Sequence, residues 1–99
     1  MLASRFGYTM KQGADENWVV YLLRCVDDTF YCGCTLDLER RIEEHNAGKG
    51  AKYVRGRTPA VLVVARHGLT KSEAHRFEAR VKRLPAKEKK AFVKTGEAN

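Results

Sequence analysis

The stretch TFYCGCTLDLERRIEEH, Thr29 to His45, decides the fold, because its apolar pattern changes period partway along. TFYCGCT alternates between two sets of side chains, as a β-strand with one buried face does. From Leu36 onward the apolar residues follow helical spacing, and the helix is expected to end at Gly48, which suits a left-handed C-terminal cap. A strand followed directly by an amphipathic helix is therefore the central unit of the predicted fold.

The segments on either side complete the predicted order of elements. WVVYLLRCV, Trp18 to Val26, is β-branched and aromatic and ends at Asp27-Asp28, so it forms a hairpin with TFYCGCT. AVLVVARH is predicted to be the third strand. A second helix is expected to begin at the capping box TKSE and to run to about Leu84, and Pro85 suits the first turn of a third helix, AKEKKAFVK. The order is ββαβαα, an α+β domain.

The length of 99 residues suits one domain with one modest core. We assign residues 18–94 to this domain, 1–17 to a flexible N-terminal arm and 95–99 to a loose C-terminus. The longest apolar runs are far shorter than the roughly 20 residues that cross a bilayer, so we expect a cytoplasmic protein with no membrane segment. An odd number of cysteines, three, favours thiols over a disulfide framework.

The charge balance points to the class of partner. There are 19 Lys and Arg residues against 12 Asp and Glu residues, which gives a formal net charge of +7. A strongly basic small domain is typical of proteins that bind polyanions, and nucleic acid is the simplest such partner.

The Cys-x-Cys pair of the second strand raises the question of a metal site. Alternation places Phe30, Cys32 and Cys34 on one face of the strand. Two thiols and the distant His45 do not complete a tetrahedral zinc site, because no second Cys or His pair stands at ligand spacing. We therefore expect both cysteines to pack as small apolar side chains, and a zinc-binding module remains a distant alternative.

Both longer helices are predicted to direct ionisable groups toward the core. The first helix has the inward stripe Leu38, Arg41, Ile42 and His45, and the second has Ala74, Phe77, Glu78, Val81 and Leu84. An arginine at the margin of a stripe can reach water, and a glutamate can lie at its rim. An inward charge otherwise needs a partner, a metal or a substrate, so the two helices together indicate a functional site.

These residues carry a resemblance to a known family. VVYLL contains Tyr21, YCG begins at Tyr31, Arg41 follows that glycine by eight positions, and a later helix carries Glu78. The pattern resembles the GIY-YIG nuclease superfamily. LERRIEEHNAGKGAKYVRGRTP and SEAHRFEARVKRL further resemble its small, single-domain bacterial branch, and the likeness extends over about residues 18–93.

The resemblance implies a fold, an activity and a set of site residues. The fold would be a three-stranded, mostly antiparallel sheet flanked by helices, and the activity that of a metal-dependent DNA endonuclease in DNA repair or recombination. Tyr21 and Tyr31 match the two motif tyrosines, Arg41 the active-site arginine and Glu78 the carboxylate that holds the metal. His45 matches a histidine found in part of the family. One carboxylate suits weakly bound Mg²⁺ or Mn²⁺, which keeps several waters.

A single active site could use both tyrosines only if the hairpin has the right register. A two-residue turn at Asp27-Asp28 would place Tyr21 and Tyr31 on opposite faces, whereas a three-residue loop beginning at Val26 pairs Tyr21 with Gly33 and puts both on one face. The loop would end with Asp28 in the left-handed region. We expect Arg41 and Glu78 on that same face, and the two cysteines of the strand on the other.

DNA contact is expected mainly from the basic loop GKGAKYVRGRTP, through Lys49, Lys52, Tyr53, Arg55 and Arg57. The helix cations Arg76, Arg80 and Lys82 are expected to point outward, and a solvated surface is the simpler interpretation of those three. Cations bind phosphates without reading the bases, so binding should be salt-sensitive and weakly specific.

Two functions of different class follow from this pattern. The first is a small metal-dependent DNA endonuclease of low sequence specificity. The second is a non-catalytic module of the same fold that only binds DNA or RNA, or that docks a protein partner supplying the cutting activity or the target. Retention of the tyrosines, the arginine and the inward Glu78 favours the nuclease, because a pure binder has no use for a carboxylate that repels phosphate.

Overall fold

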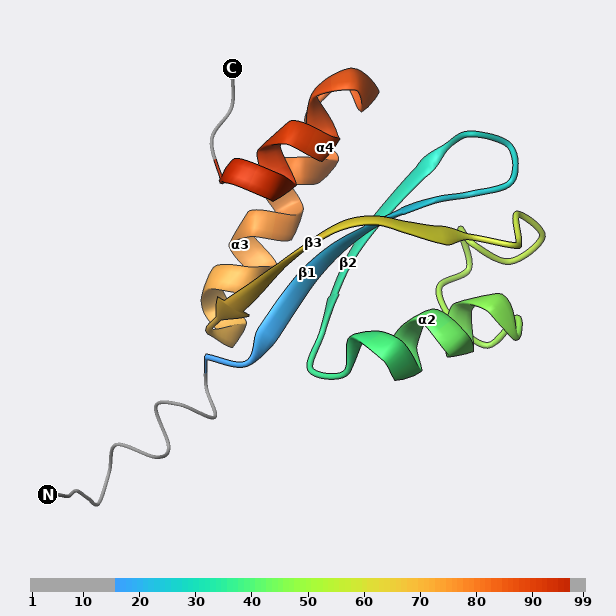
Figure 1. The fold of residues 1–99 in the computed structure, drawn as a ribbon, viewed down its shortest axis with the longest axis horizontal. Helices are drawn as coiled ribbons and strands as arrows, with labels where there is room; N and C mark the ends of the chain where they lie inside the picture. The colour runs from blue at the N-terminus through green and yellow to red at the C-terminus, as the bar shows by residue number, and fades with distance from the viewer. Residues whose placement is uncertain (1–15, 97–99) are drawn as a thin grey trace, which may run out of the picture.

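The computed structural model describes residues 16–96. Within them the elements follow in the order β1 (Trp18–Arg24), β2 (Phe30–Thr35), α2 (Leu38–Asn46), β3 (Val61–Leu69), α3 (Lys71–Lys82) and α4 (Ala86–Thr95) (Figure 1). The predicted order ββαβαα is confirmed. Most of the predicted N-terminal arm, residues 1–15, and the last three residues lie outside the described part of the chain. No helix in residues 16–96 has both the length and the apolar character needed to cross a membrane.

The three strands form one antiparallel sheet in the order β2-β1-β3, so β1 is central and β2 is an edge strand. The predicted α+β class with a three-stranded antiparallel sheet is confirmed. Helix α2 covers one face of the sheet, and α3 and α4 cover the other (Figure 1). We call these the tyrosine face and the cysteine face, after the β2 residues Tyr31 and Cys32 that point to each.

The cysteine face holds the larger apolar core. Its buried members come from two strands and two helices: Val20, Leu22, Cys32, Ala74, Val81, Phe92 and Val93. The partly buried rings of Phe30 and Phe77 pack against them, and the Phe77 and Phe92 rings stack with centroids 4.8 Å apart. The inward stripe predicted for the second helix is thus confirmed at Ala74 and Val81, which are fully buried.

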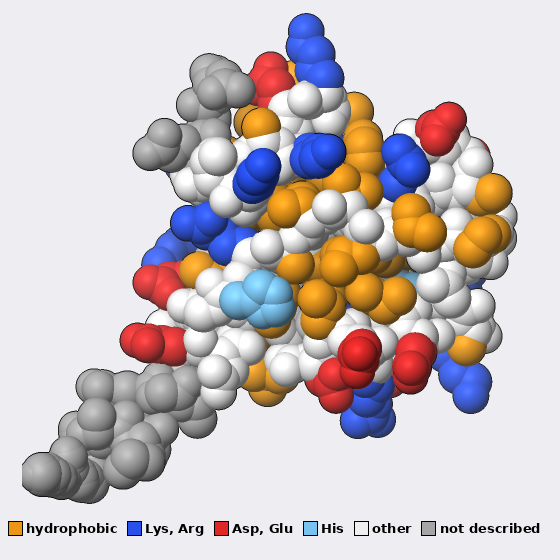
Figure 2. Space-filling view, viewed as in Figure 1, with side chains coloured by type: hydrophobic (Ala, Val, Ile, Leu, Met, Phe, Trp, Pro, Cys, Tyr) orange, Lys and Arg blue, Asp and Glu red, His pale blue; other side chains and the backbone are white. Residues whose placement is uncertain are grey.

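The tyrosine face holds a second, smaller core. Tyr21, Leu23, Cys25, Val54 and Ala60 are buried there. Leu38 and Ile42 of α2 pack against this core, and His45 of the same helix is fully buried, so the predicted inward stripe of the first helix is confirmed. Figure 2 shows apolar side chains across the middle of the visible face, with acidic and basic side chains around its margin.

The hairpin between β1 and β2 has the three-residue loop that the shared face of the tyrosines requires. Tyr21 pairs with Gly33 and Leu23 with Tyr31. Beyond the last strand pair, the Cys25 amide donates to the Thr29 carbonyl at 2.8 Å, and Asp28 has a φ of 65°. The register predicted from the motif is therefore confirmed, and Asp28 takes the left-handed conformation.

The boundaries of the later elements differ slightly from the prediction. The capping box of α3 is present at Thr70 and Glu73, but the helix ends at Lys82 instead of near Leu84. Pro85 is the N-cap residue of α4 and not part of its first turn. Strand β3 extends to Leu69, beyond the predicted His67, because it continues to pair with Trp18 of β1.

Candidate active site

A buried hydrogen bond between Tyr21 and His45 forms the centre of the tyrosine face. The Tyr21 hydroxyl oxygen lies 2.8 Å from His45 Nε2, and the two residues are 1% and 0% exposed. The Ala51 amide donates to His45 Nδ1 at 3.2 Å, so Nδ1 is the ring's acceptor and Nε2 carries the proton. Burial, aided by the charge of Arg41, lowers the pKa of His45 and favours this neutral form. His45 therefore donates to the Tyr21 oxygen.

Two glycines leave room for this pair. A Cβ at Gly33 would collide with the Tyr21 hydroxyl and would lie 2.7 Å from the ring carbon that bears it. A Cβ at Gly50 would collide with the His45 ring and would lie 2.8 Å from the His45 Cα. The role of Gly33 could be predicted from the strand register. That of Gly50 was missed, because no local pattern shows where the loop crosses His45.

Tyr31 lies beside the pair and is less buried. Its ring meets the His45 ring edge-on at 5.3 Å and lies 6.4 Å from the Tyr21 ring. The Tyr53 ring of the basic loop stacks on Tyr31 at 6.1 Å. Burial raises the pKa of both Tyr21 and Tyr31 above the ordinary tyrosine value, so each carries its proton at neutral pH.

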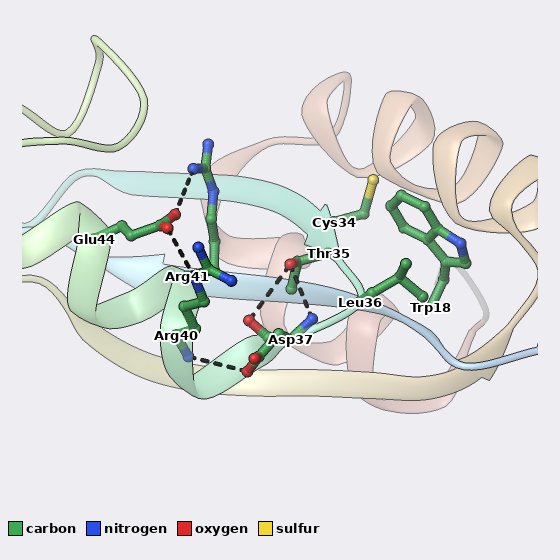
Figure 3. Close-up of a pocket in the computed structure, with 8 residues that line it drawn as sticks. All are labelled: Trp18, Cys34, Thr35, Leu36, Asp37, Arg40, Arg41 and Glu44. Atoms are coloured by element: carbon green, nitrogen blue, oxygen red, sulfur yellow. Dashed lines mark hydrogen bonds and ion pairs between the residues drawn. The ribbon is translucent and has the colours of Figure 1, made fainter. Parts of the chain in front are cut away.

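Arg41 of α2 reaches the Tyr21 hydroxyl and remains partly exposed. Its guanidinium interacts with the Tyr21 hydroxyl and, against the larger effect of burial, lowers the pKa of that hydroxyl. Arg41 also donates to the Glu44 carboxylate at 3.0 Å, and Glu44 pairs with Arg40 at 3.3 Å on its other side (Figure 3). Glu44, which sequence reasoning missed, thus braces the arginine one turn along the helix.

Glu78 does not lie where the sequence analysis placed it. We expected it on the tyrosine face, but α3 packs on the cysteine face, through its neighbours Ala74 and Val81. Its carboxylate adjoins Cys34 and helps to raise the pKa of that thiol, chiefly a burial effect, to about 12. The same carboxylate raises the pKa of both Tyr31 and Tyr21. Because β2 is an edge strand, an α3 side chain acts electrostatically on residues of both faces.

Lys82 is the second α3 residue at this edge; it is exposed, as expected, but its ammonium turns toward the strand edge. Its Nζ lies 2.7 Å from Glu78 Oε2 and 5.6 Å from the centre of the Tyr31 ring. Its charge is the largest influence that lowers the pKa of Tyr31 against burial. Helical periodicity predicts the face of the helix on which a lysine side chain starts. It does not predict the position of the ammonium group, because the four methylene groups between them are flexible.

Two hollows are lined in part by residues of β2. The first, about 400 Å³, is lined by Trp18, Cys34, Thr35, Leu36, Asp37, Arg40, Arg41 and Glu44 (Figure 3). The second, about 310 Å³, is lined by Phe30, Tyr31, Cys32, Tyr53, Lys82 and Lys89. Cys34 packs against the apolar core, as expected, yet it also lines the first hollow beside Arg41.

The predicted DNA-contacting residues of the basic loop divide into two groups. Arg57 pairs with Asp27 of the hairpin at 3.1 Å, and its guanidinium lies 4.2 Å from the centre of the Tyr53 ring. It therefore ties the loop to the hairpin and holds Tyr53 in place. Arg55 donates to the Gly50 carbonyl at 3.3 Å and is exposed to solvent, as are Lys49 and Lys52.

Among the predicted catalytic residues, Glu78 is the one that offers a carboxylate to a hard divalent cation. Residues 16–96 contain no cluster of three or more His, Cys, Asp or Glu side chains. The Glu78 side chain is 18% exposed and already accepts a cation, the Lys82 ammonium, on Oε2. Burial raises the pKa of Cys32 and Cys34 to about 12, so both remain thiols, which are poor zinc ligands. An oxygen-preferring ion with several waters is the cation that this carboxylate suits.

Comparison with known proteins matches both the sequence and the fold. The family model described as the GIY-YIG catalytic domain matches residues 17–91. A UPF0213 protein of Nitratidesulfovibrio vulgaris is 49% identical over 82 residues, which are 83% of this chain and 74% of the relative. One of Halobacterium salinarum is 51% identical over 73 residues, 74% of this chain and 95% of the relative. The solution NMR structure of protein EF2693 from E. faecalis is 40% identical with a TM-score of 0.57, over 81% of this chain and 85% of that one.

Proposed function

The chain belongs to the GIY-YIG catalytic domain family, and from that membership we propose that it is an endonuclease that hydrolyses phosphodiester bonds in DNA. The observation that supports this most strongly is the gathering of a buried Tyr21 and His45 pair with Arg41, Tyr31 and Glu78 around one strand edge. A purely structural domain gains little from burying the Tyr21 and His45 pair beside these charges, because each buried polar group must be satisfied.

We assign to Tyr21 the proton-accepting role toward the attacking water. Its oxygen accepts the His45 Nε2 proton and interacts with the Arg41 guanidinium, and both donors favour the phenolate. Burial opposes them and keeps the pKa high, so only a small fraction of the free protein has the phenolate at neutral pH. Cleavage should therefore accelerate as the pH rises above neutral.

His45 is a positioning residue in this scheme. Its Nδ1 is occupied by the Ala51 amide and its Nε2 already carries a proton, so it cannot accept one from Tyr21 in this arrangement. What it supplies is a fixed donor to the tyrosine oxygen. Tyr31, which is nearer to solvent, is assigned the orientation of the attacking water.

Arg41 and Glu78 are assigned the stabilisation of the negative charge that develops on the phosphate in the transition state. The guanidinium, braced by Glu44 at 3.0 Å, lines the first hollow and would meet a phosphate seated there. Glu78 would hold Mg²⁺ or Mn²⁺ together with waters and a substrate oxygen. Such an ion, when bound, would neutralise charge on the phosphate and activate water.

Substrate binding is assigned to the exposed cations of the basic loop. Lys49 and Lys52 are free to meet phosphates, whereas Arg57 is already engaged by Asp27 and Tyr53. Contacts of this kind depend on salt and read no bases, so a protein partner is one route to target choice, and DNA repair or recombination is the proposed setting.

The test is cleavage of supercoiled, single-stranded and branched DNA with Mg²⁺, Mn²⁺ or EDTA. Wild type should cut with either metal and not in EDTA. Glu78→Gln should abolish cutting while DNA binding stays equal or tightens slightly, because a negative charge facing phosphate is removed. Glu39→Gln, an exposed acid in the first turn of α2, is the control and should cut normally.

Two results would contradict the assignment. Equal cutting by Glu78→Gln would remove Glu78 from the metal site. Tight DNA binding by wild type without cleavage of any substrate would favour the alternative, a non-catalytic nucleic-acid-binding module.

A further inference from the structure

We propose that Lys82 is a resident cation of the active site: it occupies Glu78 in the free protein and competes with the divalent metal, which binds after DNA has drawn the lysine away. The inference rests on the proposed function, because it concerns the same carboxylate. In this proposal Lys82 determines the order of binding, with DNA first and the metal second.

The geometry distinguishes Lys82 from an ordinary surface partner four residues along a helix. The Glu78 side chain is 18% exposed, and Lys82 Nζ reaches Oε2 at 2.7 Å. The ammonium also lies 5.6 Å from the centre of the Tyr31 ring. In an ordinary surface pair of this spacing both charged groups lie in water. Here the carboxylate is largely buried, and the half-exposed lysine turns toward the strand edge where the tyrosines lie.

The charges make the two cations mutually exclusive. A divalent ion on Glu78 Oε2 would stand close to the Lys82 ammonium, and like charges at that separation repel strongly in a partly buried site. Within residues 16–96 no cluster of acids or imidazoles offers the ion a second set of ligands while the lysine stays. Glu78 can therefore hold either the lysine or the metal, but not both at that oxygen.

The second hollow is where a DNA phosphate could replace Glu78 as the partner of Lys82. Lys82 and Lys89 both line it, together with Tyr31 and Tyr53, so a DNA phosphate seated there would face two ammonium groups. Lys89 donates to the Val81 carbonyl at 2.7 Å, while the Lys82 side chain is 49% exposed on a flexible stem. A phosphate can thus replace Glu78 as the partner of Lys82 and leave Oε2 open to the metal.

The direct test is Mn²⁺ binding to the DNA-free protein, followed by electron paramagnetic resonance of the free ion. Lys82→Met should raise the Mn²⁺ affinity roughly three- to tenfold over wild type. Lys82→Arg keeps the charge and should bind as wild type does. The matched control is Lys89→Met, which removes a neighbouring charge that does not touch Glu78 and should change little. Lys82→Met combined with Glu78→Gln should lose the gain, which assigns the ion to Glu78.

A second measurement tests the order of binding. With a short DNA oligonucleotide bound, wild type should gain Mn²⁺ affinity, and Lys82→Met should gain less because its carboxylate is already open. The Glu78→Gln complex with the same DNA serves as the blank, since it removes the contribution of Mn²⁺ bound to DNA alone. Circular dichroism melting curves confirm that each variant is folded.

Unchanged Mn²⁺ affinity in Lys82→Met, or equal gains in Lys82→Met and Lys89→Met, would overturn the proposal. Its failure can be told apart from that of the nuclease assignment, because the first measurement contains neither DNA nor a cleavage step. Wild type that cuts DNA with no effect of Lys82→Met on metal binding rejects the competition alone. No cleavage together with tighter Mn²⁺ binding rejects the nuclease and keeps the competition.

Discussion

The two faces of the sheet are built on different principles. On the cysteine face, Val20, Leu22 and Val81 pack with aromatic rings into a core without a buried charge. On the tyrosine face, the centre is a hydrogen-bonded pair, Tyr21 and His45, each almost without solvent contact. Burying an apolar side chain stabilises a fold by about 1.5–3 kcal/mol, whereas a buried hydrogen bond gains roughly 1 kcal/mol net.

The difference teaches where substitutions should act. Changes on the cysteine face should lower the free energy of unfolding, while changes on the tyrosine face should lower cleavage more than stability. Helix α3 belongs to both, since Val81 packs into the apolar core and Glu78 and Lys82 reach the strand edge. Four experiments test this division, in order of the expected change in stability.

The largest effect is expected from Phe92→Ala on the cysteine face. Phe92 is 2% exposed and stacks on Phe77, so its removal leaves a cavity and should lower the free energy of unfolding by about 3–5 kcal/mol. Urea unfolding measures this. Val26→Ala, at a residue 61% exposed, is the control and should change stability by less than about 0.5 kcal/mol. A loss below about 1 kcal/mol for Phe92→Ala would mean that this face does not carry the stability.

Gly33→Ala tests the tight contact between β2 and the tyrosine face. A methyl group there collides with the Tyr21 ring, and overpacking of this kind costs about 1–3 kcal/mol. Cleavage should fall as well, because the hydroxyl is displaced from His45. In a double-mutant cycle, Gly33→Ala should be much less harmful when Tyr21 is also alanine. Additive losses would show that the strand backbone, and not the ring, resists the methyl group.

Tyr21→Phe sharpens the comparison by removing one oxygen atom. The His45 Nε2 proton loses its acceptor in a buried site, which should cost about 1–2 kcal/mol of stability. Cleavage should fall by roughly a hundredfold or more, as expected for a lost general base. Val26→Ala, at a residue 61% exposed and outside the site, is again the control and should cut at nearly the wild-type rate. A Tyr21→Phe variant with normal turnover would transfer the proton-accepting role to another group.

The smallest effect is a pH dependence of stability that originates in His45. Burial, then Arg41, lowers its pKa in the folded state, and Glu44 opposes this only in part. The unfolded state, with a histidine pKa near 6.5, therefore binds more protons, and stability should decline as the pH falls from about 7 to 5. Melting temperatures at the two pH values measure it. The decline should flatten in His45→Gln and persist in His67→Gln, whose side chain is exposed; equal slopes would assign the effect elsewhere.

Much of the fold could be predicted because its signals are local. The hairpin register followed from loop length and from the tolerance of Asp28 for a left-handed conformation, and the structure confirms both. The inward stripe of α2 followed from periodicity, which is why Arg41 and His45 were found. The roles assigned to these residues stay predictions, since geometry alone does not measure turnover.

The remaining parts of the site depend on contacts between distant segments. Periodicity placed Glu78 on an inward face. It could not reveal that α3 packs against the edge strand β2, so that the Glu78 charge raises the pKa of Tyr31 on the other face of that strand. The contacts of Gly50 with His45 and of Lys82 with Tyr31 were missed for the same reason, because they are known only once the chain is folded. Likewise, a loop cation such as Arg57 looks free in a sequence until its acidic partner is brought near.

The amide of Ala51, which donates to His45 Nδ1 at 3.2 Å, offers a spectroscopic window on the buried site. Protonation of that nitrogen, or rotation of the ring when a substrate arrives, removes the acceptor and must shift the amide resonance of one alanine. The state of His45 can thus be followed in a simple nitrogen-15 spectrum of the main chain. The Ala51 amide peak then reports the protonation and rotation of the His45 ring directly, whereas titration of the aromatic side chains would reveal them only indirectly.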